Sequence, residues 1–212
     1  MVNARPKIRF SICRYMRIMG ISNFSKIICV ALMAMIAGCA NQPSQINDVC
    51  SVFEQRDGFF NNWRSSAEES ESRYGVPIHV LMATVRKESG FQSNARPPRK
   101  KALGFIPWER QSSAYGYSQA LDGTWATYKA ETGNFGARRS NFSDAVDFIG
   151  WYHSRSAAAL GIEPGDAYRL YLAYYLGWSG YKRGNWNAAV DKVAREADSM
   201  AQSYAAQLKQ CQ

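Results

Sequence analysis

The chain has 212 residues, of which 46% are hydrophobic, and its 26 basic and 17 acidic residues give a formal net charge of +9. Six of the basic residues and none of the acidic ones lie in positions 1–38, which leaves 20 basic against 17 acidic residues in the remainder. The charge of a leader says nothing about the surface of the mature protein, whose basic and acidic residues are nearly balanced. The net charge of the whole chain therefore does not indicate a nucleic-acid partner.

Residues 1–38 are typical of an export signal. After the basic stretch, Ile27–Gly38 forms an uncharged, mostly apolar run that is too short for a comfortable membrane span. The small residues directly before Cys39 resemble the bacterial lipoprotein processing site. That resemblance implies cleavage before Cys39, lipidation of this cysteine and, because aspartate does not follow it, a periplasmic domain anchored in the outer membrane. The leader is long, and translation from Met16 or Met19 remains an alternative.

Three segments are expected along the chain. Residues 1–38 form the signal, residues 39–60 a lipid-anchored tether and lead-in, and residues 61–212 the functional domain. The stretch from Cys39 to Asp48 is polar and carries Pro43, which favours a flexible tether. The mature chain is long enough for one domain with a single hydrophobic core.

Two cysteines are candidates for a disulfide bond. Cys13 and Cys29 leave with the signal, and Cys39 is the expected lipid carrier, so Cys50 and Cys211 remain. An oxidising compartment favours their pairing, and chain ends often lie close together in a domain. Two unpaired thiols are the alternative.

Helical periodicity dominates residues 61–212 and predicts a mainly all-α fold. No convincing alternation of strand residues appears, and at most a short hairpin is expected between Ala95 and Tyr115. The expected helices, with their capping residues, are 61–73 before Gly75, a helix from Pro77 to Gly90, 122–131 before Gly133, 143–160 with Ser143 as N-cap and Gly161 as stop, one opened by Gly165-Asp166, and a last one capped by Asn187.

Glu88 is the residue on which the functional hypothesis depends. It closes the helix expected after Pro77, and Gly90 is placed to stop that helix in a left-handed turn. A carboxylate there feels the negative end of the helix dipole, and apolar neighbours would raise its pKa further. A carboxyl group that keeps its proton near neutral pH suits general acid catalysis. Taken alone, such a residue is more often a solvated glutamate in a last turn.

Two later segments favour a catalytic role for Glu88 over a solvated glutamate. They are Tyr115-Gly116-Tyr117-Ser118-Gln119 and Ala173-Tyr174-Tyr175-Leu176-Gly177. Together with the preceding Glu88-Ser89, they resemble the three motifs of the soluble lytic transglycosylase family, a branch of the lysozyme-like superfamily. The family pattern is Glu-Ser, then Gly-Leu-Met-Gln, then Ala-Tyr-Asn-Ala-Gly. The resemblance extends roughly from Tyr74 to Tyr181.

The match is full in the first motif and partial in the other two. Gly116 and Gln119 match the ends of the second motif, whereas Tyr117 and Ser118 replace Leu and Met. The third motif is matched at three positions and carries Tyr175 and Leu176 in place of Asn and Ala, and the matching positions are Ala173, Tyr174 and Gly177. These departures mean that subsite preference does not transfer from the family.

The resemblance implies a lysozyme-like helical fold and a lytic transglycosylase that acts on peptidoglycan glycan strands without a cofactor. In that family one glutamate donates a proton to the bond between N-acetylmuramic acid and N-acetylglucosamine, then accepts one as a 1,6-anhydro end forms. Glu88 takes that position here. The resemblance also implies that the Tyr174 hydroxyl bonds Glu88, and that substrate is contacted by Ser89, Gly116, Tyr117, Gln119 and Tyr174.

The stretch between the first two motifs is basic and is not expected to be helical. It contains Arg96-Pro97-Pro98-Arg99-Lys100-Lys101, in which two adjacent prolines exclude a helix. Such a loop is either a solvated surface or a cleft rim that attracts the carboxylates of peptidoglycan. Aromatic residues suited to a sugar groove gather around the motifs, about half of them expected in the core: Trp108, Tyr115, Tyr117, Trp125, Tyr174, Tyr175 and Trp178.

Other chemistries have weaker support in the sequence. His79 and His153 have no partners at metal-ligand spacing, so no metal site is expected. Ser118 has no arguable His/Asp partnership, and no phosphate-binding or dinucleotide fingerprint appears.

Two alternatives to a lyase stay open. A hydrolytic lysozyme would need a second acid, for which the nearest candidates in sequence are Glu109, Asp122 and Glu131. A non-catalytic wall-binding lipoprotein would only grip the glycan, and the departures in the second and third motifs keep that possibility alive.

Overall fold

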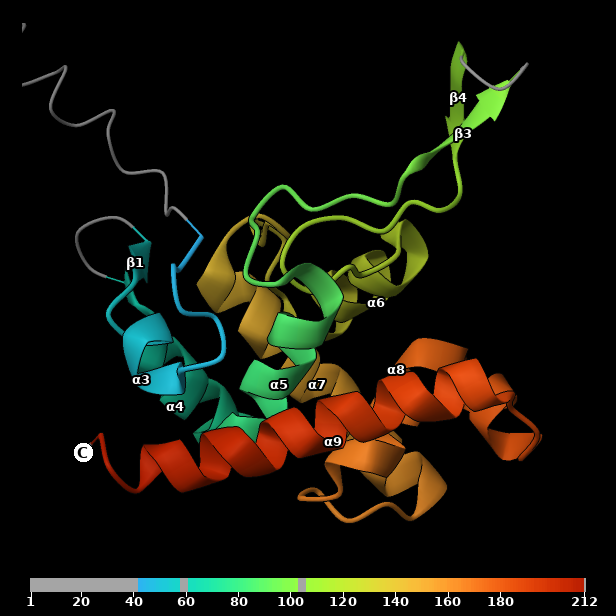
Figure 1. The fold of residues 1–212 in the computed structure, drawn as a ribbon. Helices are drawn as coiled ribbons and strands as arrows, with labels where there is room; N and C mark the ends of the chain where they lie inside the picture. Colours follow the sequence, from blue (N-terminus) through green and yellow to red (C-terminus); the bar gives the residue numbers. More distant parts are fainter. Residues whose placement is uncertain (1–41, 58–60, 103–105, 212) are drawn as a thin grey trace, which may run out of the picture. The chain divides into compact units, whose positions relative to one another are not determined.

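The computed structural model describes residues 42–57, 61–102 and 106–211, and this part of the chain is mainly helical, as the sequence predicts (Figure 1). The helices are α3 (Val49–Val52), α4 (Trp63–Tyr74), α5 (Ile78–Ser89), α6 (Asp122–Thr132), α7 (Phe142–Leu160), α8 (Ala167–Lys182) and α9 (Ala188–Leu208). Two small antiparallel hairpins accompany them, β1 (Arg56–Asp57) with β2 (Asn61–Asn62) and β3 (Arg99–Ala102) with β4 (Ile106–Arg110).

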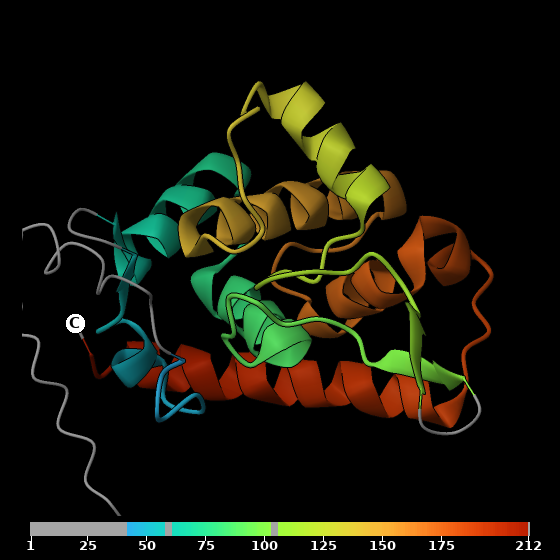
Figure 2. The same ribbon diagram turned by 90° about the horizontal axis from the view of Figure 1, so that it is seen from above.

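Helix α5 is the centre of the domain because it is apolar on nearly every side. Its residues from Val80 to Val85 are all buried, which is typical of a helix enclosed by its neighbours. It packs against α4, α7 and α9, and α9 also packs against α8. Figure 2 shows α9 along one edge of the domain beside α5. The helix that ends in Glu88 is therefore held from several directions.

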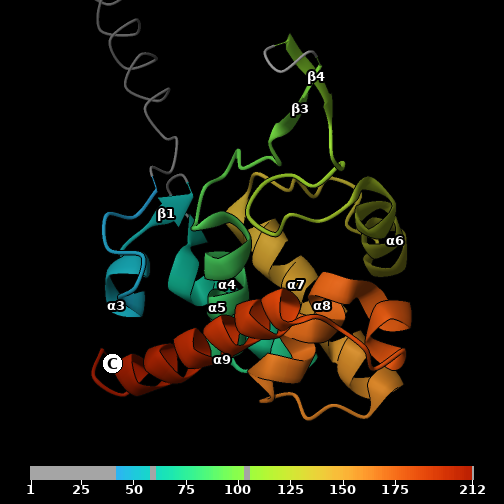
Figure 3. The ribbon, with the colours of Figure 1, turned by 45° about the vertical axis from the view of Figure 1, so that its right-hand side comes forward.

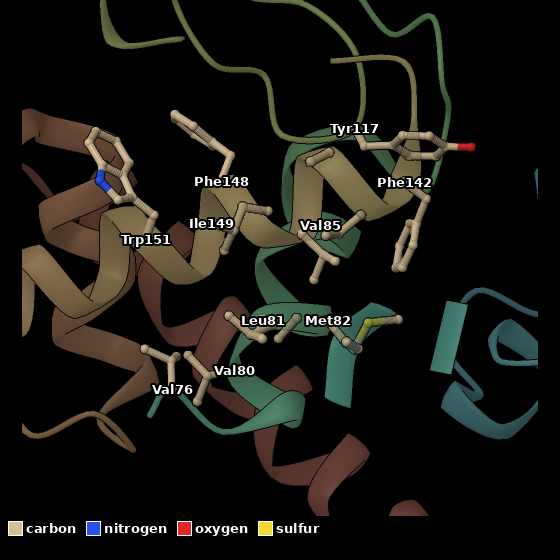
Figure 4. Packing of buried hydrophobic residues seen from close by; sticks show 14 of the residues in the cluster. Val76, Val80, Leu81, Met82, Val85, Tyr117, Phe142, Phe148, Ile149 and Trp151 are labelled. Carbon is tan, nitrogen blue, oxygen red and sulfur yellow. The ribbon is translucent and has the colours of Figure 1, made fainter. Parts of the chain in front are cut away.

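The core joins α5 and α7 to the second motif (Figure 4). Leu81, Met82 and Val85 of α5 lie near the apolar face of α7, in the same buried cluster. At one end of that cluster Trp63 stacks on Phe142 with ring centroids 4.0 Å apart. Such aromatic contacts add about 0.5–1.5 kcal/mol each beyond the buried area, so they fix the position of this end of the core.

Helices α4 and α7 approach closely at Gly150. A Cβ atom at this position would lie 2.3 Å from Ser70 Oγ, so only glycine fits. Ser70 Oγ in turn donates to the Val146 carbonyl at 3.0 Å. Next to this crossing, the Asp147 carboxylate accepts hydrogen bonds from the hydroxyl groups of Tyr74 and Tyr128. This network fastens α4 and α6 to α7.

The predicted helix ends are mostly confirmed. Gly75, Gly90, Gly133 and Gly161 all follow their helices in the left-handed conformation, and Asn187 caps α9 by accepting from the Val190 N–H. The expected N-cap of α7 was wrong. Asn141 and not Ser143 caps that helix, accepting from the Asp144 N–H at 3.0 Å. The earlier start places Phe142 inside the helix, where its ring is fully buried.

The expectation of a flexible tether is wrong from Gln42 onward. Gln42 Nε2 donates to the Gly90 carbonyl at 2.8 Å, and Gln207 Nε2 donates to the Asn47 carbonyl at 3.0 Å. Tyr204 also donates to the Ile46 carbonyl. Backbone carbonyls of this segment therefore bind α9, and the domain begins well before residue 61. The signal and Cys39 lie outside the described residues.

A disulfide bond joins Cys50 of α3 to Cys211 after α9, with the Cα atoms 5.8 Å apart. The predicted pairing is confirmed, and it links the two ends of the domain. Every helix in the described ranges is either too short or too polar to cross a membrane.

The short hairpin that the sequence allowed between Ala95 and Tyr115 is present as β3–β4. The pairing has a register shift between Arg99 and Lys101, so the ladder is irregular. Figures 1 and 3 show that this hairpin projects away from the helical body.

Candidate active site

Glu88 lies in the last turn of α5, beside α8. Its Oε1 accepts a hydrogen bond from the Tyr171 hydroxyl at 2.7 Å. Burial raises the pKa of Glu88 from 4.5 to about 7, although the Tyr171 hydrogen bond and the Lys87 charge both lower it. The side chain is therefore divided between its acid and carboxylate forms at neutral pH, as a group that both gives and takes a proton requires.

The implied bond from Tyr174 to Glu88 is wrong. The Tyr174 hydroxyl donates instead to the Ser118 carbonyl at 2.5 Å, and Tyr171 holds the acid. Residues three apart share one face of a helix, so Tyr171 and Tyr174 both point toward the same region from successive turns of α8. Tyr171 lies outside the motif, and only its helical spacing from Tyr174 could have indicated it.

Ser89 completes the first motif but binds within its own helix. Its Oγ donates to the Val85 carbonyl at 3.2 Å, and only 8% of the residue is exposed. The following Gly90 adopts φ 57° and donates to the Arg86 carbonyl at 3.1 Å, which ends α5 directly after the acid.

The second motif forms a tight loop closed by a bridge between Tyr115 and Ala120. Gly116 adopts φ 74°, and a Cβ atom there would lie 2.0 Å from the Arg139 carbonyl oxygen. The next N–H, that of Tyr117, donates to the same oxygen at 3.0 Å. Glycine is thus required at Gly116 both for its conformation and for the close approach of the backbone.

Gln119 is oriented by two backbone acceptors. Its Nε2 donates to the carbonyls of Ala95 at 3.0 Å and Gly116 at 2.8 Å. Because both partners are acceptors, they fix which end of the amide is the nitrogen. The Oε1 atom is left to accept from a ligand, and Gln119 lies in a left-handed conformation at the edge of a groove.

The side chain of Tyr117 is buried in the core. Its side chain is 0% exposed and packs edge-on against Trp63 and Phe142, with centroids 5.5 and 5.6 Å away. The large ring replaces an aliphatic family residue and anchors the second motif in the core. A buried ring offers no surface to a ligand, in contrast to the substrate contact that the resemblance implies.

A groove of about 250 Å³ runs between the second and third motifs. Its walls are Gln119 to Leu121 on one side and Tyr174 to Gly177 on the other, with Phe148 and Tyr152 of α7 between them. Burial raises the pKa of Tyr174 and the nearby charge of Glu88 adds to the rise, which places the acid close to this wall. The three motifs therefore meet at one site, as their order suggested.

The comparison with family models decides the family. A model described as a transglycosylase SLT domain matches residues 27–211. This chain belongs to the transglycosylase SLT domain family. Family membership indicates an enzyme that acts on peptidoglycan and agrees with the helical, lysozyme-like fold. A search of curated proteins found no match.

Two of the candidate second acids of this SLT domain are engaged in ion pairs. Asp122 pairs with Arg139 at 2.7 Å, and Glu131 pairs with Arg155. The side chain of Glu109 lies outside the described part of the chain. Among the described charged groups, Lys87 is the one that shifts the pKa of Glu88, and no carboxylate contributes.

The two histidines of the SLT domain are apart from the acid chemistry. His153 is fully buried, its Nε2 lies 2.9 Å from Thr84 Oγ1, and burial lowers its pKa to about 3. Burial also lowers the pKa of His79. In the described ranges, no three His, Cys, Asp or Glu side chains are grouped so as to hold a metal ion.

Proposed function

We propose that this protein is a peptidoglycan lytic transglycosylase in which Glu88 serves as the single acid and base. It cleaves the β-1,4 bond between N-acetylmuramic acid and N-acetylglucosamine and leaves a 1,6-anhydromuramoyl end. The observation that carries the proposal is the burial of Glu88 at the end of α5, where Tyr171 of α8 donates to it and where burial raises its pKa to about 7.

The reaction balances with one carboxyl group. Protonated Glu88 gives its proton to the glycosidic oxygen as the bond to the anomeric carbon breaks, and the muramoyl N-acetyl oxygen stabilises that carbon. The Glu88 carboxylate then takes the proton of the C6 hydroxyl, whose oxygen bonds to the anomeric carbon. Glu88 regains its proton, and no water is consumed. Tyr171 donates to the carboxylate throughout and keeps it aimed.

The surroundings of Glu88 support a lyase over a hydrolase. Glycoside hydrolysis uses two carboxyl groups about 5–9.5 Å apart, one of which attacks or directs water. Asp122 and Glu131 each form an ion pair with an arginine, and neither shifts the pKa of Glu88.

The same group argues against a purely binding role. A carboxyl group whose pKa is raised by burial lowers stability once it ionises, and binding glycan gives no reason to keep it. Glutamine would hold the same space without that cost.

The test is digestion of purified peptidoglycan by the mature protein, followed by mass spectrometry of the products. A lytic transglycosylase releases muropeptides with 1,6-anhydro ends, whereas a lysozyme releases reducing ends of the hydrated mass. Glu88→Gln protein at the same concentration is the control. Reducing ends from wild type, absent with the variant, would assign hydrolysis to Glu88 and refute the lyase.

We also propose an anchored periplasmic location, with lipid on Cys39 holding the domain to the outer membrane. More than one acyl chain is needed for stable anchoring, and lipoprotein processing supplies several. Basic residues before and within the β3–β4 hairpin favour acidic peptidoglycan as the partner. Arg96, in this stretch, lies 4.1 Å from the centroid of the Tyr115 ring. No nucleic-acid partner is proposed.

A further inference from the structure

Two large apolar side chains are exposed at the groove. In the described part of the chain, Leu121 is 48% exposed and Tyr175 is 55% exposed, and both line the groove between the second and third motifs. Phe135, the other large apolar side chain with high exposure there, is 73% exposed and is not among the groove residues. Leaving such groups in water forgoes burial energy, so a pair that faces one groove marks a binding surface.

The ring of Tyr175 lies next to that of Tyr171, which binds Glu88. The Tyr175 and Tyr171 ring centroids are 6.3 Å apart with an angle of 31° between their planes, and Tyr171 binds Glu88. Tyr175 also replaces the family's asparagine, so a flat ring stands where the motif has a small amide.

The helix that carries Tyr175 is kinked close to this ring. Gly177 adopts φ 68° and ψ 164° and interrupts α8 two residues later. The kink in α8 therefore lies at the groove wall, two residues after Tyr175.

We propose that Tyr175 is a stacking platform for one sugar ring of the glycan strand, next to the bond that is cut. The C–H face of the sugar would lie on the tyrosine ring, as flat aromatic surfaces favour. Leu121 would cover the opposite edge of that sugar, and Gln119 Oε1 would accept from its N–H or hydroxyl groups. The groove volume of about 250 Å³ is below the roughly 300–1,000 Å³ of pockets that enclose whole drug-sized ligands, which suits one ring of a longer polymer.

The proposal rests on the proposed function but is tested without catalysis. Binding of peptide-free glycan strands is measured with Glu88→Gln protein and with the Glu88→Gln/Tyr175→Ala double variant. We expect about tenfold weaker binding of the double variant, equal to about 1.4 kcal/mol, and recovery with Tyr175→Trp. Phe135→Ala in the same background is the matched control and should bind normally.

Several outcomes overturn the platform. Unchanged binding by the Tyr175→Ala variant, an equal loss with Phe135→Ala, or no glycan binding by the Glu88→Gln protein would each do so. In the active protein, Tyr175→Ala should raise KM while kcat changes little, because the ring contacts substrate before and during reaction. If glycan binding depends on Tyr175 but wild type yields no anhydro product, the lyase is refuted and the platform stands. If the Tyr175→Ala variant has the KM of wild type and yields anhydro products, the platform is refuted and the lyase stands.

Discussion

The Tyr171 hydroxyl donates to Glu88 Oε1 at 2.7 Å, from one helical turn before the tyrosine of the third motif. That bond favours the carboxylate, and burial favours the acid. Burial outweighs the Tyr171 bond and the Lys87 charge, and the pKa lies at about 7.

Tyr171→Phe and Tyr174→Phe separate the two tyrosines. Without the Tyr171 donor, the pKa of Glu88 should rise by about one to two units, because a hydrogen bond to a charged group is worth about 1.5–3 kcal/mol. The alkaline fall in activity should then move to higher pH. Tyr174→Phe should leave that fall in place and reduce stability by about 1 kcal/mol through loss of the Ser118 bond. Activity–pH profiles of both variants decide, and a shift with Tyr174→Phe alone would restore Tyr174 as the partner of Glu88.

Glu88→Gln should reduce turnover at least ~100-fold, since the variant has no proton to give. Wild-type activity should fall as pH rises through about 7, where the acid form is lost. Release of anhydromuropeptides at the wild-type rate would remove Glu88 from the mechanism.

The same substitution should change stability in a pH-dependent way. The folded-state pKa of Glu88, about 7, lies above its ordinary value of 4.5, so its contribution to stability is full below pH 4.5 and is lost as pH rises through 7. Glu88→Gln should therefore be more stable than wild type at pH 8, by up to about 3 kcal/mol, and similar at pH 4. Urea unfolding at both pH values measures this, and an equal difference at both would mean that ionisation is not its cause.

Gly116→Ala should disrupt the second motif. The strained conformation costs about 1–3 kcal/mol, and the added methyl group meets the Arg139 carbonyl. Gly133→Ala is the matched control, because Gly133 has φ 72° with open space around it. We expect the Gly116 variant to be less stable than the Gly133 variant and to lose activity. Equal stability of the two would show that the loop yields at Arg139.

Cys50→Ser should lower the melting temperature and leave activity at low temperature intact. The chain-entropy model gives an upper bound near 5 kcal/mol for a loop this long. Calorimetry of oxidised wild type, reduced wild type and the variant measures the loss. Free thiols in freshly exported wild type would contradict the pairing in the cell.

Cys39→Ser should block lipidation. The protein should then remain as an uncleaved precursor in the inner membrane or appear without lipid. Fractionation and intact mass measure both, and an outer-membrane protein of unchanged mass would refute the anchor. The assignment of Glu88 would be unaffected.

The sequence predicted the parts of this molecule that depend on local chemistry. Helix α5 begins after Pro77 and ends before Gly90, because proline and glycine favour particular backbone conformations whatever their neighbours are. The three motifs predicted one site because their order and spacing resemble those of a family with a defined fold. The hydrogen bond of Tyr171 depends on how α8 packs beside α5, which spacing within the motif does not encode.

The segment from Gln42 to Asp48 misled for a similar reason. Its polar composition is that of a tether, but its attachment to α9 uses backbone carbonyls, whose partners are invisible in composition. Tyr117 misled because a motif position was read as a substrate contact, whereas the ring serves the core.

The bond between Cys50 and Cys211 encloses nearly every helix of the domain, along with the projecting β3–β4 hairpin. A protease that cuts the hairpin would therefore produce two fragments that stay covalently joined, with Glu88 on one and Tyr171 on the other. The nicked enzyme would migrate as a single species until the disulfide bond is reduced. The fragment with Glu88 and the fragment with Tyr171 would stay linked to each other.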